Sequence, residues 1–329
     1  MLLSLNPYGL TYTLGLQGGG TPQANPHPLG VAGFIAIVRE LGLTVIELDH
    51  RWLTPLDADG LARLRGELHG LQPVCSFWLS HTPGEDLREA VRCTSALGAR
   101  ILRFHLTPVL EGARAAWGAR WREMIEHAHA TLRRESSRIA DAGLVLAIED
   151  HQDVGSEELL DLVEQLGPHT GICLDTGNPF SVGEDPVAFT RRAAPRIRHV
   201  HLKDYVAQFT SEGYRLVRCA IGDGAVPFTE IAAILEEQGT PLAASIEPGA
   251  LESRHIRVFT PDWWNGYPLR EARELGTMLG RLRASRLADD AECRTPWEQG
   301  QSGAALADYE RAQVWRSVRN IRSLGICRG

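Results

Sequence analysis

The sequence predicts an α/β fold of the (β/α)8 barrel class, and three observations support this prediction. Short apolar segments bounded by Gly or Pro alternate with helical segments along the first 250 residues. Four consecutive apolar segments each end in a carboxylate or an imidazole. The chain has 329 residues, 43% of them hydrophobic and 23% charged, which is enough for one barrel of roughly 250 residues. An open doubly wound sheet would alternate in the same way, but it would not direct ligands from four consecutive strands to one centre.

The expected elements follow one another in strict alternation. Eight strands of the buried parallel kind are expected at 9–14, 44–48, 74–79, 101–104, 144–148, 170–174, 197–200 and 242–246. Helices are expected at 29–41, 59–71, 85–97, 121–141, 156–166, 185–193 and 228–238.

Two segments depart from the repeating strand-helix unit. Residues 205–221, after the seventh strand, are expected to form a hairpin with strands at 208–210 and 214–217, which would serve as a lid or as a wall of the substrate site. Residues 251–329 exceed the single helix that a barrel needs, and they end in an expected helix at 302–324. Because no linker rich in Gly, Ser or Pro separates them, we expect a single barrel domain over 1–329, with its core at 1–250 and a C-terminal extension packed on it.

Composition limits the classes of partner. The formal net charge of −7 and the pI near 6.0 argue against nucleic acid and anionic membranes as partners, so a small molecule is expected. No secretory signal is expected at residues 1–7, and no segment approaches the ~20 apolar residues of a membrane span. Six cysteines without a CxxC pair indicate reduced thiols and a cytoplasmic location. A homo-oligomer is compatible with the sequence, which does not set the number of subunits.

The spacing of the four ligand residues is the strongest functional signal. Glu149 and Asp175 are 26 residues apart, Asp175 and His201 are again 26 apart, and Glu247 follows after a further 46. A strand-helix unit that returns to a parallel strand needs roughly 30 residues, so each short step is one unit and the long step is one unit with an insertion. The four side chains are therefore expected at the carboxyl ends of neighbouring strands, where active sites of this fold lie.

These ligand types predict a metal centre. A single acidic residue after a strand is usually a helix N-cap or a solvated loop residue, but that explanation is weak for four consecutive units. Two Glu, one Asp and one His suit one divalent ion such as Mn, Mg, Co or Zn. Such an ion would polarise the carbonyl of a polyhydroxy substrate and stabilise an enediolate, while Glu149 and Glu247 act as acid and base. His199, two residues before His201, should face the same side one layer deeper.

Over residues 3–248 the chain resembles the superfamily of xylose isomerase-like barrels, which contains sugar isomerases and epimerases. The resemblance rests on residues 148–151 (IEDH), 174–178 (LDTGN), 199–204 (HVHLKD), 222–228 (GDGAVPF) and 246–248 (IEP). It implies that the same four residues bind one metal and that both Glu are catalytic. The implied function is a metal-dependent isomerase or epimerase of a small keto-sugar or sugar-acid derivative.

Other residues bear on the substrate. Asn178 stands where the ketose epimerases have a His, and Arg218 corresponds to their basic residue before the glycine loop. Lys203 is the strongest candidate for a substrate contact, and His105 at the end of the fourth strand is another. The long extension resembles that of decarboxylases of 3-oxo sugar acids such as 3-oxo-isoapionate. A decarboxylase using the same enediolate is therefore the alternative, and a cationic pocket would favour it.

Two further classes are less well supported. A non-catalytic sugar-binding barrel is a third alternative, which the retention of all four ligand residues argues against. An endonuclease of the superfamily would need a larger, His-rich ligand set and a basic face, and the negative net charge opposes it.

Overall fold

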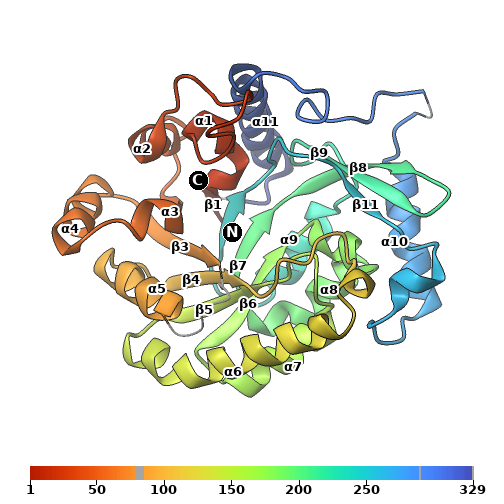
Figure 1. The fold of residues 1–329 in the computed structure, drawn as a ribbon, viewed down its shortest axis with the longest axis horizontal. Helices are drawn as coiled ribbons and strands as arrows, with labels where there is room; N and C mark the ends of the chain where they lie inside the picture. Colours follow the sequence, from red (N-terminus) through yellow and green to blue (C-terminus); the bar gives the residue numbers. More distant parts are fainter. Residues whose placement is uncertain (79–84, 289, 328–329) are drawn as a thin grey trace.

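The computed structural model describes residues 1–78, 85–288 and 290–327, and within them eight parallel strands close into a barrel (Figure 1). The order around the barrel is β1-β10-β7-β6-β5-β4-β3-β2. The barrel strands are β1 (Leu2–Leu5), β2 (Val45–Asp49), β3 (Gln72–Trp78), β4 (Ile101–His105), β5 (Val145–Glu149), β6 (Thr170–Asp175), β7 (Ile197–Leu202) and β10 (Ala243–Ile246). The expected (β/α)8 class is confirmed. Leu79, the last residue of the expected third strand, lies outside the described residues.

Helices surround this barrel on the outside (Figure 1). The main ones are α2 (Gly30–Glu40), α4 (Ala58–Glu67), α5 (Glu85–Ala96), α6 (Ala119–Asp141), α7 (Ser156–Leu166), α8 (Pro186–Ala193) and α9 (Phe228–Glu236). Short helical turns are η1 (Pro7–Leu10), α1 (Thr11–Leu14), α3 (His50–Leu53), η2 (Arg114–Trp117), η3 (Asn178–Val182), η4 (Ala194–Arg196) and η5 (Pro261–Trp264). No helix in the described part of the chain is both long and apolar enough to cross a membrane.

The expected position of the first strand was wrong. Residues 9–14 are helical, in η1 and α1, and the strand is the earlier segment Leu2–Leu5. Leu2 to Leu5 pair in parallel with Ala243 to Ile246 of β10, more than 230 residues later in the chain. Because this pairing closes the barrel, a long-range contact and not the local apolar pattern decides which segment is the strand.

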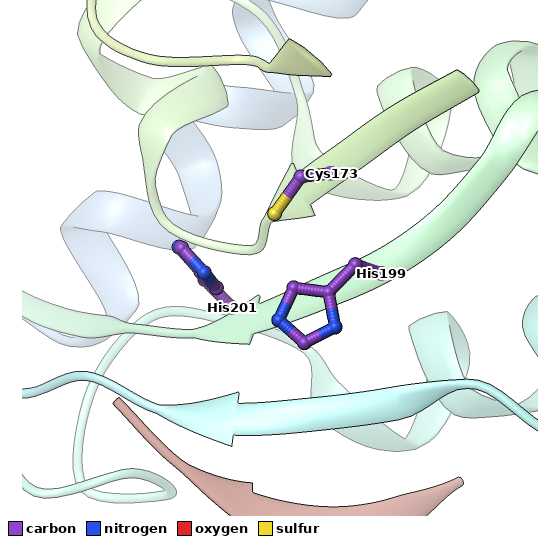
Figure 2. Close-up of side chains that lie close together, drawn as sticks. All are labelled: Cys173, His199 and His201. Carbon is purple, nitrogen blue, oxygen red and sulfur yellow. The ribbon is translucent and has the colours of Figure 1, made fainter. Parts of the chain in front are cut away.

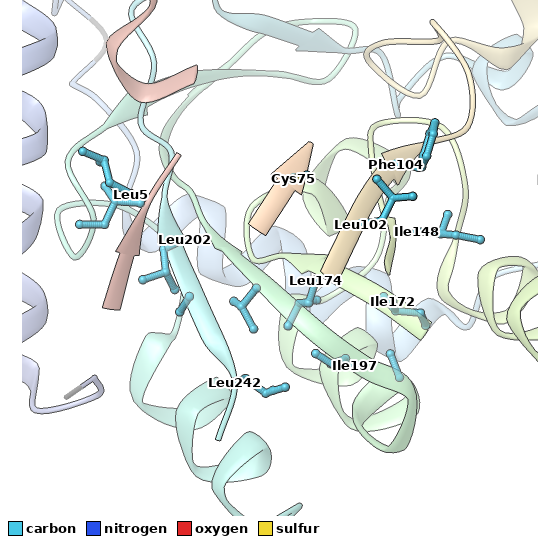
Figure 3. Packing of buried hydrophobic residues seen from close by; sticks show 14 of the residues in the cluster. Leu5, Cys75, Leu102, Phe104, Ile148, Ile172, Leu174, Ile197, Leu202 and Leu242 are labelled. Atoms are coloured by element: carbon cyan, nitrogen blue, oxygen red, sulfur yellow. The ribbon is translucent and has the colours of Figure 1, made fainter. Parts of the chain in front are cut away.

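Alternation along the strands separates an apolar outer face from a polar inner face. On β4, Leu102 and Phe104 are fully buried in the apolar layer beneath the helices, whereas Arg103 and His105 line an interior cavity (Figure 3). The other strands follow the same period of two, which places their carboxyl-end polar residues in the interior. The polar side chains of the barrel therefore converge at one end.

The hairpin expected after the seventh strand is present. It consists of β8 (Asp204–Phe209) and β9 (Tyr214–Cys219), and β11 (Arg254–Ile256) from the C-terminal segment adds a third antiparallel strand beside β9. Two helices complete the C-terminal segment: α10 (Ala272–Ala284), which was not predicted, and α11 (Gly303–Leu324). Val314, Val318 and Ile321 of α11 belong to the main hydrophobic cluster of the barrel.

Glu310 joins α11 to the start of the chain. Its carboxylate is fully buried and accepts hydrogen bonds from the backbone N–H groups of Tyr12 and Thr13 at 3.0 and 2.9 Å. It also accepts from the hydroxyls of Thr11 and Thr13. A helix N-terminus leaves such N–H groups unpaired, so a side chain from α11 satisfies them.

We expect Glu310→Gln to lower the free energy of unfolding by about 1–3 kcal/mol, because its amide N–H2 would face donors instead of accepting from them. Urea denaturation followed by circular dichroism measures this change. Asp308→Asn, an exposed position on the same helix, is the matched control and should be nearly neutral. Equal effects of the two substitutions would contradict a specific role for Glu310.

Candidate metal centre

Four residues from the ends of four neighbouring strands meet inside the barrel. Glu149 ends β5, Asp175 ends β6, His201 lies near the end of β7, and Glu247 directly follows β10. Each offers one ligand atom, and these atoms all lie within 4.8 Å of one another. All four side chains are buried. The structure therefore brings together every metal ligand that the sequence predicts.

Two cations hold the ligand carboxylates in place. Arg103 of β4 forms an ion pair with Glu149, and Lys203 pairs with Asp175 and, at 2.9 Å, with Glu247. Burial lowers the pKa of Lys203, but the adjacent carboxylates of Asp175 and Glu247 outweigh burial and raise it. Conversely, burial opposes ionisation of Glu247, but Lys203 and His201 lower its pKa. Lys203 and Glu247 are therefore ionised at neutral pH.

Glu47 of β2, which the sequence reasoning did not single out, completes the surroundings of His201. Its fully buried carboxylate lies 3.0 Å from His201 Nε2 and 3.0 Å from His199 Nε2, and it accepts a hydrogen bond from Ser76 Oγ. Burial raises the pKa of Glu47, but the two imidazoles outweigh it and lower that pKa well below its ordinary value. The sequence Val45–Asp49, with acidic residues alternating with apolar ones, carries a signal for it.

Glu47 also orients the imidazole of His201. While Nε2 faces Glu47, Nδ1 faces the ligand carboxylates, 2.8 Å from Glu247 Oε2 and 3.4 Å from Glu149 Oε1. Nδ1 has no hydrogen-bond partner among the described residues. A carboxylate behind a ligating histidine fixes the ring and its tautomer in metal proteins. Here it would leave the Nδ1 lone pair directed at the cluster.

A second group of ligand atoms lies one layer deeper. Figure 2 shows Cys173 of β6 beside His199 and His201 of β7, and these three residues also satisfy the spacing of a metal site. However, burial raises the pKa of the Cys173 thiol, and only a thiolate is a good ligand. His199 Nε2 already pairs with Glu47 and lies 3.2 Å from Ser245 Oγ. The group of Glu149, Asp175, His201 and Glu247 is therefore the better candidate for a metal site.

A cavity of about 270 Å³ opens above the cluster and reaches Glu247. Its lining includes three of the residues predicted to contact substrate, His105, Lys203 and Arg218. Asn178, the fourth, is not among the described lining residues. It is fully buried in the turn after β6, where its backbone N–H donates to Asp175 Oδ1 at 3.3 Å and its side-chain amide has no hydrogen-bond partner among the described residues.

One wall of the cavity carries two neutral imidazoles. The rings of His105 and His151 stack at 4.9 Å, and Trp78 lies 5.5 Å from His105. Burial, with Arg103 nearby, lowers the pKa of His105 to about 3. Burial and His105 lower the pKa of His151 well below its usual value. Uncharged rings of this kind can exchange hydrogen bonds with sugar hydroxyls in either direction.

Comparison with known proteins identifies the same barrel fold. Residues 35–259, more than half of the chain, match the family described as xylose isomerase-like TIM barrel. The chain belongs to this family. Among solved structures, D-psicose 3-epimerase crystallised with D-fructose superimposes with a TM-score of 0.55 at 17% identity, covering 87% of this chain and 96% of the epimerase. At that identity the similarity concerns the fold alone.

Two curated relatives align with shorter parts of this chain. The 3-oxo-isoapionate decarboxylase of Pectobacterium atrosepticum is 24% identical over 207 residues, which is 62% of this chain and 72% of that enzyme. The uncharacterized protein YihM of Escherichia coli is 33% identical over 89 residues, 27% of each chain. The chain therefore matches only about a quarter of the length of YihM.

The lowered pKa of His105 predicts a pH effect on stability. The unfolded chain binds a proton at this residue below about pH 6.5, whereas the folded chain does not until about pH 3. The free energy of unfolding should therefore fall as the pH drops from 6.5 towards 3, and it should fall less steeply in His105→Gln. Urea titrations across this pH range test this, with exposed His27→Gln as the control. Parallel pH profiles for wild type and His105→Gln would refute the prediction.

Proposed function

We propose that this protein is a divalent-metal-dependent isomerase or epimerase of a small keto-sugar or sugar-acid derivative. The observation that carries the proposal is the buried group of Glu149, Asp175, His201 and Glu247, whose ligand atoms lie within 4.8 Å of one another. His201 Nδ1 lies 2.8 Å from Glu247 Oε2 and 3.4 Å from Glu149 Oε1, so it could bind one ion together with these carboxylates. A divalent ion held there, such as Mn, Mg, Co or Zn, would polarise a substrate carbonyl.

The chain itself supplies the acid and the base. Glu149 ends β5 and Glu247 directly follows β10, and these strands lie on either side of β7 in the barrel. One carboxylate could therefore remove a proton from the carbon next to the carbonyl while the other returns it. Asn6 donates to Glu247 Oε2 at 3.0 Å and Arg103 pairs with Glu149. These contacts hold each carboxylate at a set position. An enediolate of the substrate would be the shared intermediate.

A decarboxylase of a 3-oxo sugar acid is the second candidate, and one observation favours it. Four cationic side chains line the cavity: Arg103, Lys203, Arg218 and Arg254. Loss of carbon dioxide from a 3-oxo acid passes through the same enediolate, so the metal ligands would serve both reactions. The similarity to the 3-oxo-isoapionate decarboxylase points the same way. We further propose a cytoplasmic enzyme, since all six cysteines are free thiols.

A graded series of variants tests the metal centre. We expect Glu149→Gln and Asp175→Asn to lose tight binding of Mn or Co, because each removes a ligand charge. Glu47→Gln keeps all four ligands and should weaken binding by roughly 10- to 100-fold. Isothermal titration of the metal-stripped protein measures all three. Asp153→Asn, a buried carboxylate outside the cluster, is the control. Unchanged metal binding in Glu149→Gln and Asp175→Asn would overturn the proposed site.

The reaction is tested in heavy water with candidate ketoses and 3-oxo sugar acids. Deuterium incorporated at carbon without loss of carbon identifies isomerisation or epimerisation, whereas released bicarbonate identifies decarboxylation. Glu149→Gln and Glu247→Gln should each lower kcat by roughly 10²- to 10⁴-fold, as followed by NMR. The absence of both products from every substrate tried, with metal bound, would support a non-catalytic sugar-binding barrel instead.

A further inference from the structure

The cations of the cavity differ in how they are neutralised. Arg103 pairs with Glu149, Lys203 pairs with Asp175 and Glu247, and Arg254 pairs with Glu252. Arg218 of β9 is the exception among the described residues that line the cavity, because no described carboxylate lies within 4.0 Å of its guanidinium.

The guanidinium of Arg218 is also short of hydrogen bonds. Its Nη1 donates to the backbone carbonyl of Glu252, and its Nε has no partner in the described part of the chain. The residue is 4% exposed. A buried guanidinium with an unfilled donor and no carboxylate within 4.0 Å is costly in the protein alone, and it is the state expected of a group that binds an anionic ligand.

The surroundings fix where this group lies. Arg218 is paired across the hairpin with Tyr205, whose buried hydroxyl also has no described partner. On the other side is Gly249, two residues after the ligand Glu247, with a φ of +67°; a Cβ there would lie 3.4 Å from Arg218 Cδ and Nε. The guanidinium is therefore confined between the hairpin and the loop that carries Glu247, and it borders the same cavity.

We infer that the substrate is a sugar acid and that Arg218 binds its carboxylate. This inference rests on the proposed metal-dependent sugar chemistry and narrows its substrate class. A guanidinium matches a carboxylate with two parallel hydrogen bonds. A phosphate, with about two charges and three terminal oxygens, would need further cations, and the other three in the cavity already have partners.

Ligand binding to the metal-loaded protein tests the inference. Isothermal titration compares short-chain aldonates with the neutral ketoses and the sugar phosphates of the same chain length. Wild type should bind at least one aldonate more tightly than its neutral and phosphorylated counterparts. Arg218→Gln should lower that affinity by roughly 10- to 100-fold, a larger factor than its effect on the affinity for neutral sugars. Arg218→Lys should recover part of the loss, because it keeps the charge without the fork.

Controls separate this inference from the proposed function. Arg257→Gln, at a half-exposed arginine outside the cavity lining, should bind aldonates like wild type. Metal titration of each variant measures the metal centre separately from sugar-acid binding. If Arg218→Gln does not fold, the aldonate affinity of Arg218→Lys is compared with wild type instead. The inference is overturned if no aldonate is preferred, if Arg218→Lys and Arg218→Gln bind aldonates like wild type, or if phosphates are preferred. If wild type binds no divalent metal, the proposed function is overturned instead.

Discussion

The buried carboxylates at the carboxyl end of the barrel cannot remain ionised without cations in contact, and much of the site follows from this constraint. An isolated ion in a protein interior costs several kcal/mol. Glu149 is compensated by Arg103, Asp175 and Glu247 by Lys203, and Glu47 by His201, whose pKa is raised. The same constraint explains why burial raises the pKa of Asp150, with the carboxylate of Asp175 raising it further.

A metal ion would enter this balance as one more cation. The pKa of His201 is raised well above its ordinary value, since the adjacent Cys173, Glu47 and Glu247 outweigh burial. An imidazole must be neutral to bind a metal, so metal binding would release a proton from this ring. Glu47 would retain its contact with Nε2 throughout.

Sequence reasoning succeeded where a local pattern and a repeated spacing agreed. The equal steps between Glu149, Asp175 and His201 reflect the strand-helix unit itself, so four side chains could be assigned to one end of one sheet.

Prediction from the sequence failed where contacts between residues far apart in the chain determine the structure. The apolar segment 9–14 has a strand-like composition, yet pairing with β10 selects Leu2–Leu5 as the strand. Asn178, assigned to the substrate by its position in the chain, is fully buried in the turn after β6, and its contact with substrate stays a prediction. Glu47 was missed because its partners, His199 and His201, are more than 150 residues away.

The contact between Glu310 and the N-terminal turns has a consequence for the order in which the protein is made. Tyr12 and Thr13 leave the ribosome almost 300 residues ahead of the carboxylate that accepts from their N–H groups. Nearby Asn6 and Tyr8 line the cavity, and β1 must also wait for β10. These turns are therefore completed only after α11 has been made, and a ribosome-bound chain that stops before α11 would lack the acceptor for the N–H groups of Tyr12 and Thr13.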